Sequence, residues 1–483
     1  MQYQPSLEKR KSLPAEKVSV TDSLGQVRSG AGSGQKFQWQ DLFWPVLIVF
    51  LALCYSFATG PFRAPDEPHH FFRAYEISEG RLIAALPGGG FVGDWLPHSL
   101  DKTALILGGY PFVPEMHVDR AAMARAWAVK LKSHRGFVPF PGAALHSPLV
   151  YLPAAAGISL GKAMHARPLI LFYLARCGNA LVAGGLIGLA LRRLWRSAPY
   201  VATIALFPMC LFQVGNLTSD AVTFGICFFW FSEILSARQQ SCPKGTPIRW
   251  ILLALVLSQL RFPYPLLGLL VLAIPRPLTG ETKAARWRFF ALFFGALILP
   301  CLLWISVVQG LRVQLRPNVA VDPGAQLQFI ASQPLAFLGI FYGSLREFGY
   351  EFWRQMIGVL GWLNLSLPIW IPAGVTTCLL ITICSSDTAT VRLTKVLRSA
   401  WLILALTALF LTAVVVYLAW NQVAAPRIEG WQGRYVIPIL PLLASALASA
   451  WLRQFRWLAY AALTFSCLAN VASIFYLVRA TWL

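Results

Sequence analysis

Residues 399–420 read Ser-Ala-Trp-Leu-Ile-Leu-Ala-Leu-Thr-Ala-Leu-Phe-Leu-Thr-Ala-Val-Val-Val-Tyr-Leu-Ala-Trp, an apolar run that holds no charged residue. A helix needs about 20 such residues to cross the hydrocarbon core of a bilayer. A core helix of a soluble protein would interrupt the run with a polar face. This stretch therefore predicts a membrane-spanning helix.

Similar runs recur along the chain, which has 483 residues and is 57% hydrophobic but only 13% charged. A soluble chain carries about 25% charged residues. The other clear spans are residues 43–60, 168–191, 198–215, 219–236, 289–309, 368–386, 435–452 and 457–477. A further apolar stretch, 250–274, is interrupted by Arg261 and two prolines. The composition predicts an all-α polytopic membrane protein.

The positions of Lys and Arg predict the orientation, because cytoplasmic loops carry an excess of both. Residues 1–42 are predicted to be a disordered, basic cytoplasmic tail. Five further basic clusters are predicted to be cytoplasmic: 192–196, 238–249, 276–288, 392–398 and 453–456. The net charge of +21 then acts as an orientation signal that also attracts anionic membrane lipids, so we expect no nucleic-acid partner.

The segment 147–164 is the one apolar stretch whose crossing would conflict with this charge pattern, because 192–196 would then lie outside. We therefore place it on the outer face as a juxtamembrane helix. The stretch 250–274 must turn back near Arg261, as a hairpin of two short helices. This gives about eleven transmembrane helices, with the N-terminus in the cytoplasm, the C-terminus outside and a long outer loop at 61–167.

The densest polar cluster, residues 63–75, follows the first span and reads Arg-Ala-Pro-Asp-Glu-Pro-His-His-Phe-Phe-Arg-Ala-Tyr. The carboxylates of Asp66 and Glu67, ringed by His and Arg side chains, suit a general base or a metal ligand. On a helix, His70 and Arg73 would point the same way. The alternative is a charged helix cap that anchors the chain at the interface.

Three other positions carry polar side chains on the predicted outer side. Asp220 lies in the turn between two spans, where it could equally be the N-cap of the next helix. Arg261, followed by Tyr264, interrupts an apolar stretch and suits a phosphate contact, although it could also snorkel from the hairpin tip. Gln432 and Arg434 lie in a loop whose aromatic residues could be a simple interfacial belt.

Several short motifs together resemble the domain of unknown function 2142 family of bacterial membrane proteins, over residues 45–475. The motifs are Pro65-Asp66-Glu67-Pro68-His69 with Arg73-Ala74, Ser147-Pro148-Leu149-Val150-Tyr151-Leu152-Pro153, Pro208-Met209 with Ser219-Asp220-Ala221, Gly358-Val359-Leu360-Gly361-Trp362, and Gln432-Gly433-Arg434-Tyr435-Val436-Ile437-Pro438. That family is similar to GT-C glycosyltransferases, multi-span enzymes that use polyprenyl-phosphate sugars on the outer face.

The resemblance implies a single GT-C-like transmembrane domain over residues 43–483, in the bacterial inner membrane. It implies that Asp66, with Glu67 adjacent, acts as base or metal ligand and that Asp220 is a second acid. GT-C enzymes often carry a lysine where Arg261 stands, in a comparably broken hairpin. The resemblance therefore implies that Arg261 contacts the phosphate in place of that lysine.

The resulting hypothesis is a glycosyltransferase that moves a sugar from a polyprenyl-phosphate donor to a cell-envelope glycan or lipid acceptor. Asp66 would take the proton of the acceptor hydroxyl, while Arg261, Arg434 or both would contact the phosphate. Four further side chains complete the predicted binding set: Tyr264, Gln432, Arg73 and His70. A metal ion, Mg²⁺ or Mn²⁺, could be held by Asp66, Asp220 and His69.

Two other functions fit the sequence less closely. A non-catalytic binder or flippase of lipid-linked sugars would tolerate the loss of Asp66 but not that of Arg261. A secondary transporter is disfavoured, because the chain has no detectable repeats and its polar residues gather on one predicted side.

Overall fold

The computed structural model describes residues 39–88, 90–108, 115–239, 246–313, 316, 319–387 and 393–483. Most of the basic tail predicted at 1–42 lies outside these residues. Leu42–Leu483 forms one compact unit, separate from Met1–Asp41. Within this unit nearly all regular structure is helical, which confirms a helical membrane protein in broad terms.

Three helices form the centre of the unit: α2 (Phe43–Ala58), α8 (Pro168–Leu194) and α11 (Ser219–Arg238). Small residues let them approach closely, as is common between membrane helices. A Cβ atom on Gly188 of α8 would lie 2.3 Å from the Cα atom of Pro45. In the most apolar window of α11, 89% of the residues are buried, so this helix is surrounded by protein.

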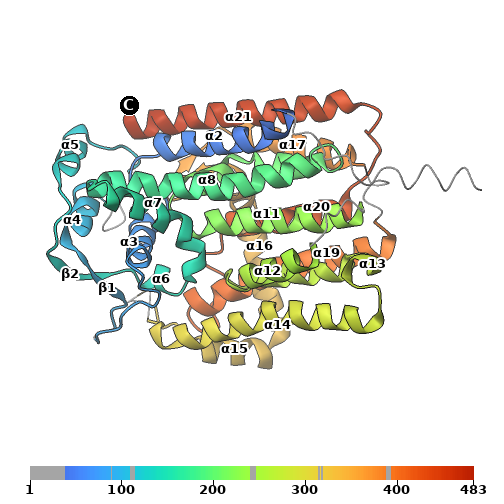
Figure 1. Ribbon diagram of the computed structural model, residues 1–483, viewed down its shortest axis with the longest axis horizontal. Coiled ribbons are helices and arrows are strands. Elements are labelled where there is room, and N and C mark those ends of the chain that lie inside the picture. The colour runs from blue at the N-terminus through green and yellow to red at the C-terminus, as the bar shows by residue number, and fades with distance from the viewer. Residues whose placement is uncertain are drawn as a thin grey trace, which may run out of the picture. The chain divides into compact units, whose positions relative to one another are not determined.

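A short helix, η1 (Trp39–Leu42), lies at the boundary between the two units in the sequence. Within Leu42–Leu483 the other helices pack around the centre, and most lie side by side in Figure 1. In chain order they are α9 (Pro199–Ala205), α10 (Pro208–Gly215), α12 (Thr246–Ser258), η3 (Tyr264–Ala273), α13 (Arg276–Thr279), α14 (Lys283–Val308), η4 (Gln309–Leu311), α15 (Pro323–Ser332), α16 (Pro334–Ile357), α17 (Trp370–Cys384), α19 (Lys395–Trp420), η5 (Gly433–Val436), α20 (Leu440–Leu447) and α21 (Arg456–Trp482).

Among the described residues, five helices are long and apolar enough to cross a membrane: α8, α11, α14, α19 and α21. Other predicted spans are shorter or broken. The run at 198–215 forms α9 and α10, because a helix cannot continue smoothly into Pro208. The stretch 250–274 forms α12 and η3 with a turn at Arg261, which matches the predicted hairpin. The number of crossings stays a prediction.

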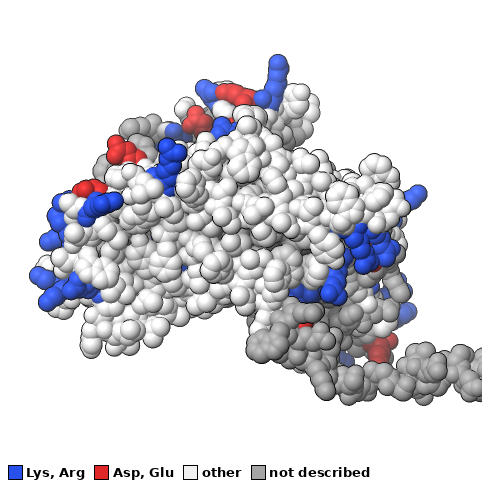
Figure 2. Space-filling model, turned by 90° about the horizontal axis from the view of Figure 1, so that it is seen from above, with Lys and Arg blue, Asp and Glu red and all other residues white. Residues whose placement is uncertain are grey.

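The loops gather at two ends of the helices. At one end, called the basic end here, Nε2 of Gln239 donates to Oγ of Ser197 at 3.0 Å and the backbone N–H of Asp387 donates to the carbonyl of Ser197. Glu233 pairs there with Arg193 and Arg249. Figure 2 shows charged side chains along opposite margins of one face and an uncharged surface between them, as a lipid-facing belt requires.

The opposite end, called the loop end, carries the small elements of residues 61–167, at the left of Figure 1. They are α3 (Glu67–Ser78), β1 (Gly93–Pro97), α4 (His98–Ile106), α5 (Arg120–Ala128), β2 (Arg135–Pro139), α6 (Pro141–Ala144), η2 (Pro148–Tyr151) and α7 (Leu152–Ala163). β1 and β2 pair antiparallel, with Gly93 opposite Pro139. A second hairpin, β3 (Val359–Leu360) with β4 (Leu365–Ser366), joins this end through a hydrogen bond from Trp362 to the carbonyl of Phe62.

The segment 147–164 packs lengthwise against the first half of α8 instead of lying flat. Gly178 of α8 meets the carbonyl of Pro153, and Gly157 of α7 meets that of Leu174, so the two helices are antiparallel. The 12 residues of α7 extend about 18 Å, which is less than the thickness of a hydrocarbon core, about 30 Å. The four residues of η2 precede α7 directly and lengthen the segment. Its place on or partly in the outer face stays a prediction.

The predicted orientation can be tested with single cysteines in a variant that lacks the native ones. Ser159 and Ser332 are exposed at the loop end and Arg196 at the basic end. We expect Ser159→Cys and Ser332→Cys to react with a membrane-impermeant maleimide in intact cells, and Arg196→Cys only after permeabilisation. Labelling of Arg196→Cys in intact cells would show that the basic end faces outward.

Candidate functional site

Asp220 lies in the first turn of α11, but it does not cap that helix. The cap is Thr218, whose hydroxyl oxygen accepts a hydrogen bond from the backbone N–H of Ala221 at 3.2 Å. The carboxylate of Asp220 is therefore available for other partners, although it is 4% exposed. A buried carboxylate needs such partners, because burial of an unpaired charge is costly.

Two arginines from distant parts of the chain supply them. Nη2 of Arg261, at the hairpin tip between α12 and η3, lies 3.1 Å from one oxygen of Asp220. Nε of Arg434, in η5, lies 3.3 Å from the other oxygen. The structure thus brings together three predicted site residues. We call Asp220, Arg261 and Arg434 the charged triad.

Two tyrosines hold the triad in place. The hydroxyl of Tyr264 donates to the carbonyl of Tyr435 at 2.9 Å, which ties the hairpin tip to η5. The guanidinium of Arg261 lies over the ring of Tyr435, 4.2 Å from its centroid. Such a cation–π contact stabilises a partly desolvated arginine by about 0.5–2 kcal/mol.

The triad carries one more positive than negative charge. Arg434 is 6% exposed; its Nε atom meets Asp220 in the ion pair, and its Nη1 atom finds no hydrogen-bond acceptor among the described residues. Buried guanidinium donors are normally satisfied, because each unmet donor costs about 1–3 kcal/mol. A net positive, buried site with unused N–H donors fits an anion such as a phosphate.

Two histidines and a tyrosine of the loop end lie beside the triad. Nδ1 of His70 is 2.7 Å from the hydroxyl of Tyr151, and Nε2 of His146 is 3.5 Å from that of Ser219. Burial lowers the pKa of His70 well below its usual range, as do the neighbouring charges of His146, Arg434 and Arg261. Burial lowers the pKa of His146 to about 4, and Arg261 adds to the effect. Both rings are neutral at pH 7.

Asp66 differs from the other acids of its cluster. Its side chain is exposed and makes no cap hydrogen bond to α3, contrary to the capping alternative. Its backbone is left-handed, with φ at 55°, a conformation that costs a non-glycine residue about 1–3 kcal/mol and recurs at functional sites. Burial raises the pKa of the Tyr151 hydroxyl, and the negative charges of Asp220 and Asp66 raise it further.

Glu67 is fully buried in an ion pair with Arg176 of α8. Nε and Nη2 of Arg176 each donate to one carboxylate oxygen at 2.7 Å. The other guanidinium N–H groups donate to the carbonyls of Ser56, Thr59 and Gly60, so all five donors are used. Glu67 also accepts the backbone N–H of Leu217 at 3.0 Å, which fixes the turn before Asp220.

Arg73 and His69 lie apart from the triad's ion pairs. Arg73 is fully buried, pairs with Glu76 on the same helix and donates to the carbonyl of Leu82 at 2.7 Å. His69 follows Asp66 by three residues on α3. The structure therefore gives Arg73 a set of partners within the loop end instead of a place beside Arg434.

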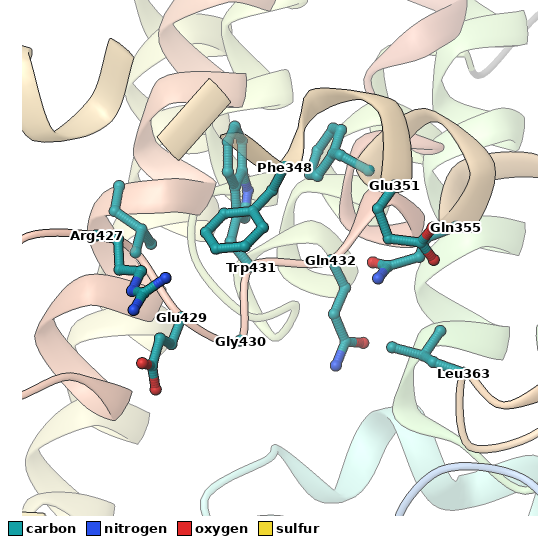
Figure 3. A pocket seen from close by; sticks show the side chains of 11 residues that line it. Phe348, Glu351, Gln355, Leu363, Arg427, Glu429, Gly430, Trp431 and Gln432 are labelled. Atoms are coloured by element: carbon teal, nitrogen blue, oxygen red, sulfur yellow. The ribbon is translucent and has the colours of Figure 1, made fainter. Parts of the chain in front are cut away.

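Gln432 lines a cavity of about 380 Å³ between α16 and the loop before η5 (Figure 3). Its Oε1 atom is buried and accepts no hydrogen bond among the described residues. Gln432 precedes Arg434 by two residues, so their Cα atoms are at most about 7 Å apart. The cavity therefore lies next to the triad.

The described residues do not fit the predicted metal site. No three His, Cys, Asp or Glu side chains among them come close enough to share a metal ion. Both oxygens of Asp220 face guanidinium groups, whose positive charge opposes a divalent cation. Asp66, Asp220 and His69 are thus not brought into one coordination group.

Sequence reasoning missed two residues of this region. Arg176 interrupts the apolar run 168–191 as Arg261 interrupts 250–274. A charged side chain inside such a run is energetically costly, and this argument would have identified Arg176 as it identified Arg261. His146 has no local signal other than its place directly before the Ser147–Pro153 motif. Only the packing of η2 against α3 and α11 brings its ring to Ser219.

Helices of membrane-spanning length define a multi-pass membrane protein, and this one carries a buried site of net positive charge at one end. The chain belongs to the family described as "Predicted membrane protein (DUF2142)", which matches residues 48–443 and includes every site residue discussed above. No curated protein and no solved structure matches the chain. The predicted likeness to the GT-C fold thus stays a prediction.

The Glu67–Arg176 pair predicts a large stability effect. Glu67→Gln leaves a buried guanidinium without its counter-charge, which costs about 3–5 kcal/mol. The matched control is Glu347→Gln, because Glu347 and Arg427 form a pair in which both side chains are 49% exposed, worth at most about 1 kcal/mol. Thermal unfolding of the purified protein, followed by tryptophan fluorescence, measures both. Equal, small shifts in Tm would show that the buried pair contributes little.

The lowered pKa of His146 predicts a loss of stability in acid. Between pH 6.5 and about 4 the unfolded chain binds a proton at this position and the folded chain does not. Stability is therefore complete above pH 6.5 and falls as the pH decreases, by at most about 1.4 kcal/mol per pH unit. His146→Gln should flatten this part of the profile of Tm against pH. His134→Gln, at an exposed histidine, should leave it unchanged.

Proposed function

We propose that this protein is a glycosyltransferase of the bacterial inner membrane, acting at the loop end on the extracytoplasmic side. Its donor is a sugar carried on polyprenyl phosphate, and its acceptor is a cell-envelope glycan or lipid. The N-terminus lies in the cytoplasm in this proposal, which follows from the distribution of Lys and Arg.

The charged triad is the observation that carries the proposal. Arg261 and Arg434 converge on one carboxylate at the end of the helices, where a lipid phosphate would lie while its tail remains between helices and bilayer. Arginine forms paired hydrogen bonds with phosphate oxygens, and Arg434 has N–H donors that its protein neighbours leave unused. Asp220 holds the two guanidinium groups in position before the lipid binds.

The chemical step is a single displacement. The acceptor oxygen attacks the anomeric carbon as its proton passes to the carboxylate of Asp66. The bond between the anomeric carbon and the phosphate oxygen breaks, and its electron pair leaves with the polyprenyl phosphate. Arg261 and Arg434 stabilise the negative charge that grows on that phosphate. The displacement inverts the anomeric centre, and no metal takes part in the step.

Asp66 suits the role of base because it is exposed, has no ion pair among the described residues and keeps a strained backbone. Glu67, in contrast, is committed to Arg176 and supports the turn that carries Asp220. His70, Tyr151 and His146 are neutral polar groups that contact one another near the triad, so they can accept or donate hydrogen bonds without competing for the phosphate.

Complementation of a deletion strain tests the proposal. Surface glycans, analysed by mass spectrometry, should lose a sugar in the deletion and regain it with the unaltered protein. Asp66→Asn should lower transfer about 10²–10⁴-fold, and Arg434→Gln about 10²–10³-fold. Membrane levels of each variant, measured by immunoblot, separate loss of activity from loss of protein.

Two matched controls accompany these variants. Asp119→Asn changes an exposed carboxylate of the loop end to another good N-cap residue, and Arg346→Gln changes an exposed arginine of α16. Both should restore the glycan. If Asp66→Asn also restores it while Arg434→Gln does not, a binder or flippase of lipid-linked sugars replaces the transferase. If the deletion changes no glycan, both proposals fail.

A further inference from the structure

The cavity beside Gln432 has the composition of a carbohydrate site. Its walls combine aromatic rings (Phe348, Phe352 and Trp431), side-chain amides (Gln355 and Gln432) and carboxylates (Glu351 and Glu429). Rings provide apolar faces for the C–H surface of a sugar, whereas amides and carboxylates bind its hydroxyl groups. At about 380 Å³ it is large enough for a small ligand, since such sites measure about 300–1,000 Å³.

Figure 3 shows how these groups are arranged. The carboxylate of Glu351 and the amide of Gln355 lie on one side, Arg427 and Glu429 lie on the other, and the rings of Phe348 and Trp431 lie between them. The rings are rigid: Trp431 donates from Nε1 to Thr412 at 2.9 Å and packs 4.3 Å from Phe352. The aromatic wall is therefore formed before any ligand arrives.

Hydrogen-bonding capacity remains on the polar walls. Oε1 of Gln432 is buried and accepts nothing among the described residues. Glu351 forms an ion pair with Arg354, and Glu429 forms one with Arg316. A carboxylate can accept about four hydrogen bonds. Hydroxyl groups of a ligand can use the acceptors that are left.

The charges on the lining restrict the ligand further. Each charged side chain of the lining is paired: Glu351 with Arg354, Glu429 with Arg316, and Arg427 with Glu347. The lining therefore offers no free counter-charge to a uronic acid, and it favours neutral sugars or amino sugars whose N–H groups donate to the two carboxylates. The neighbouring charged triad has a net positive charge instead, so a phosphate and a sugar would bind in neighbouring places.

We infer that this cavity, lined by Glu351, Gln355, Glu429, Trp431 and Gln432, is a binding site for a neutral or amino sugar. The binding site itself does not depend on the proposed function; only the origin of the sugar, from acceptor glycan or from lipid-linked donor, rests on it. Gly433 lies between the two sites in the sequence. A Cβ atom there would lie 2.0 Å from the carbonyl oxygen of Phe352, so the absence of a side chain lets η5 pack directly against α16.

Saturation-transfer NMR on the purified, detergent-solubilised protein tests the inference with glucose, N-acetylglucosamine, glucosamine and glucuronate as probes. We expect saturation transfer from the protein to one or more of the first three sugars and none to glucuronate. In Gln355→Leu/Gln432→Leu the binding should weaken about tenfold or more. The matched control, Gln422→Leu, changes an exposed amide of the same loop and should bind as the unaltered protein does.

A second variant keeps the test decisive if the double leucine variant folds poorly. Glu351→Gln/Glu429→Gln removes the negative charges and should allow glucuronate to bind. The inference is overturned if no probe receives saturation transfer, or if all variants bind the probes equally well. Arg434→Gln should keep sugar binding, so loss of glycan transfer in that variant tests the proposed function separately.

Competition identifies the source of the sugar. A polyprenyl-phosphate hexose should displace the bound probe if the cavity holds the donor's sugar and leave it bound if the cavity holds the acceptor. Polyprenyl phosphate without a sugar should displace it in neither case. Displacement by the bare lipid phosphate would show that the cavity binds lipid instead, which also overturns the inference.

Discussion

The buried pair between Glu67 and Arg176 is the constraint on which the loop end depends. Arg176 lies well inside an apolar run, where its charge is tolerated only because all five of its N–H donors are used. Its acceptors come from the end of α2 and the start of α3. Glu67 in turn holds the backbone before Asp220. One ion pair thus fixes the positions of three helices relative to one another.

The charged triad is built on that foundation. Asp220 lies in the first turn of α11, a helix surrounded by protein, and its carboxylate is 4% exposed and must be paired. The arginines reach it from a hairpin that turns back and from a short helix next to α16. The guanidinium of Arg434 has a buried donor without an acceptor among the described residues, whereas all five donors of Arg176 are used. The contrast separates an arginine that supports the fold from one that has donors left for a ligand.

The neighbouring cavity extends the site toward α16. The triad has a net positive charge, whereas the charged side chains of the cavity lining are paired, so the two places differ in preference although Gln432 and Arg434 are only two residues apart. A lipid-linked sugar has a matching pattern, with a charged phosphate next to an uncharged ring. Asp66, directly before α3, is exposed and has no ion pair among the described residues, unlike Glu67.

The sequence by itself determined the helical membrane class, five helices of membrane-spanning length, the turn at Arg261 and the grouping of basic loops, because these depend on local hydrophobicity and charge. It also indicated Arg261, because a charge in an apolar stretch is costly, and Asp220 and Arg434, because polar residues gather in the segments between spans. Only the tertiary structure decided which of these groups meet. Asp66 and Glu67 are adjacent in sequence, yet one is exposed and the other is buried against Arg176, since the left-handed turn at Asp66 directs neighbouring side chains into different surroundings.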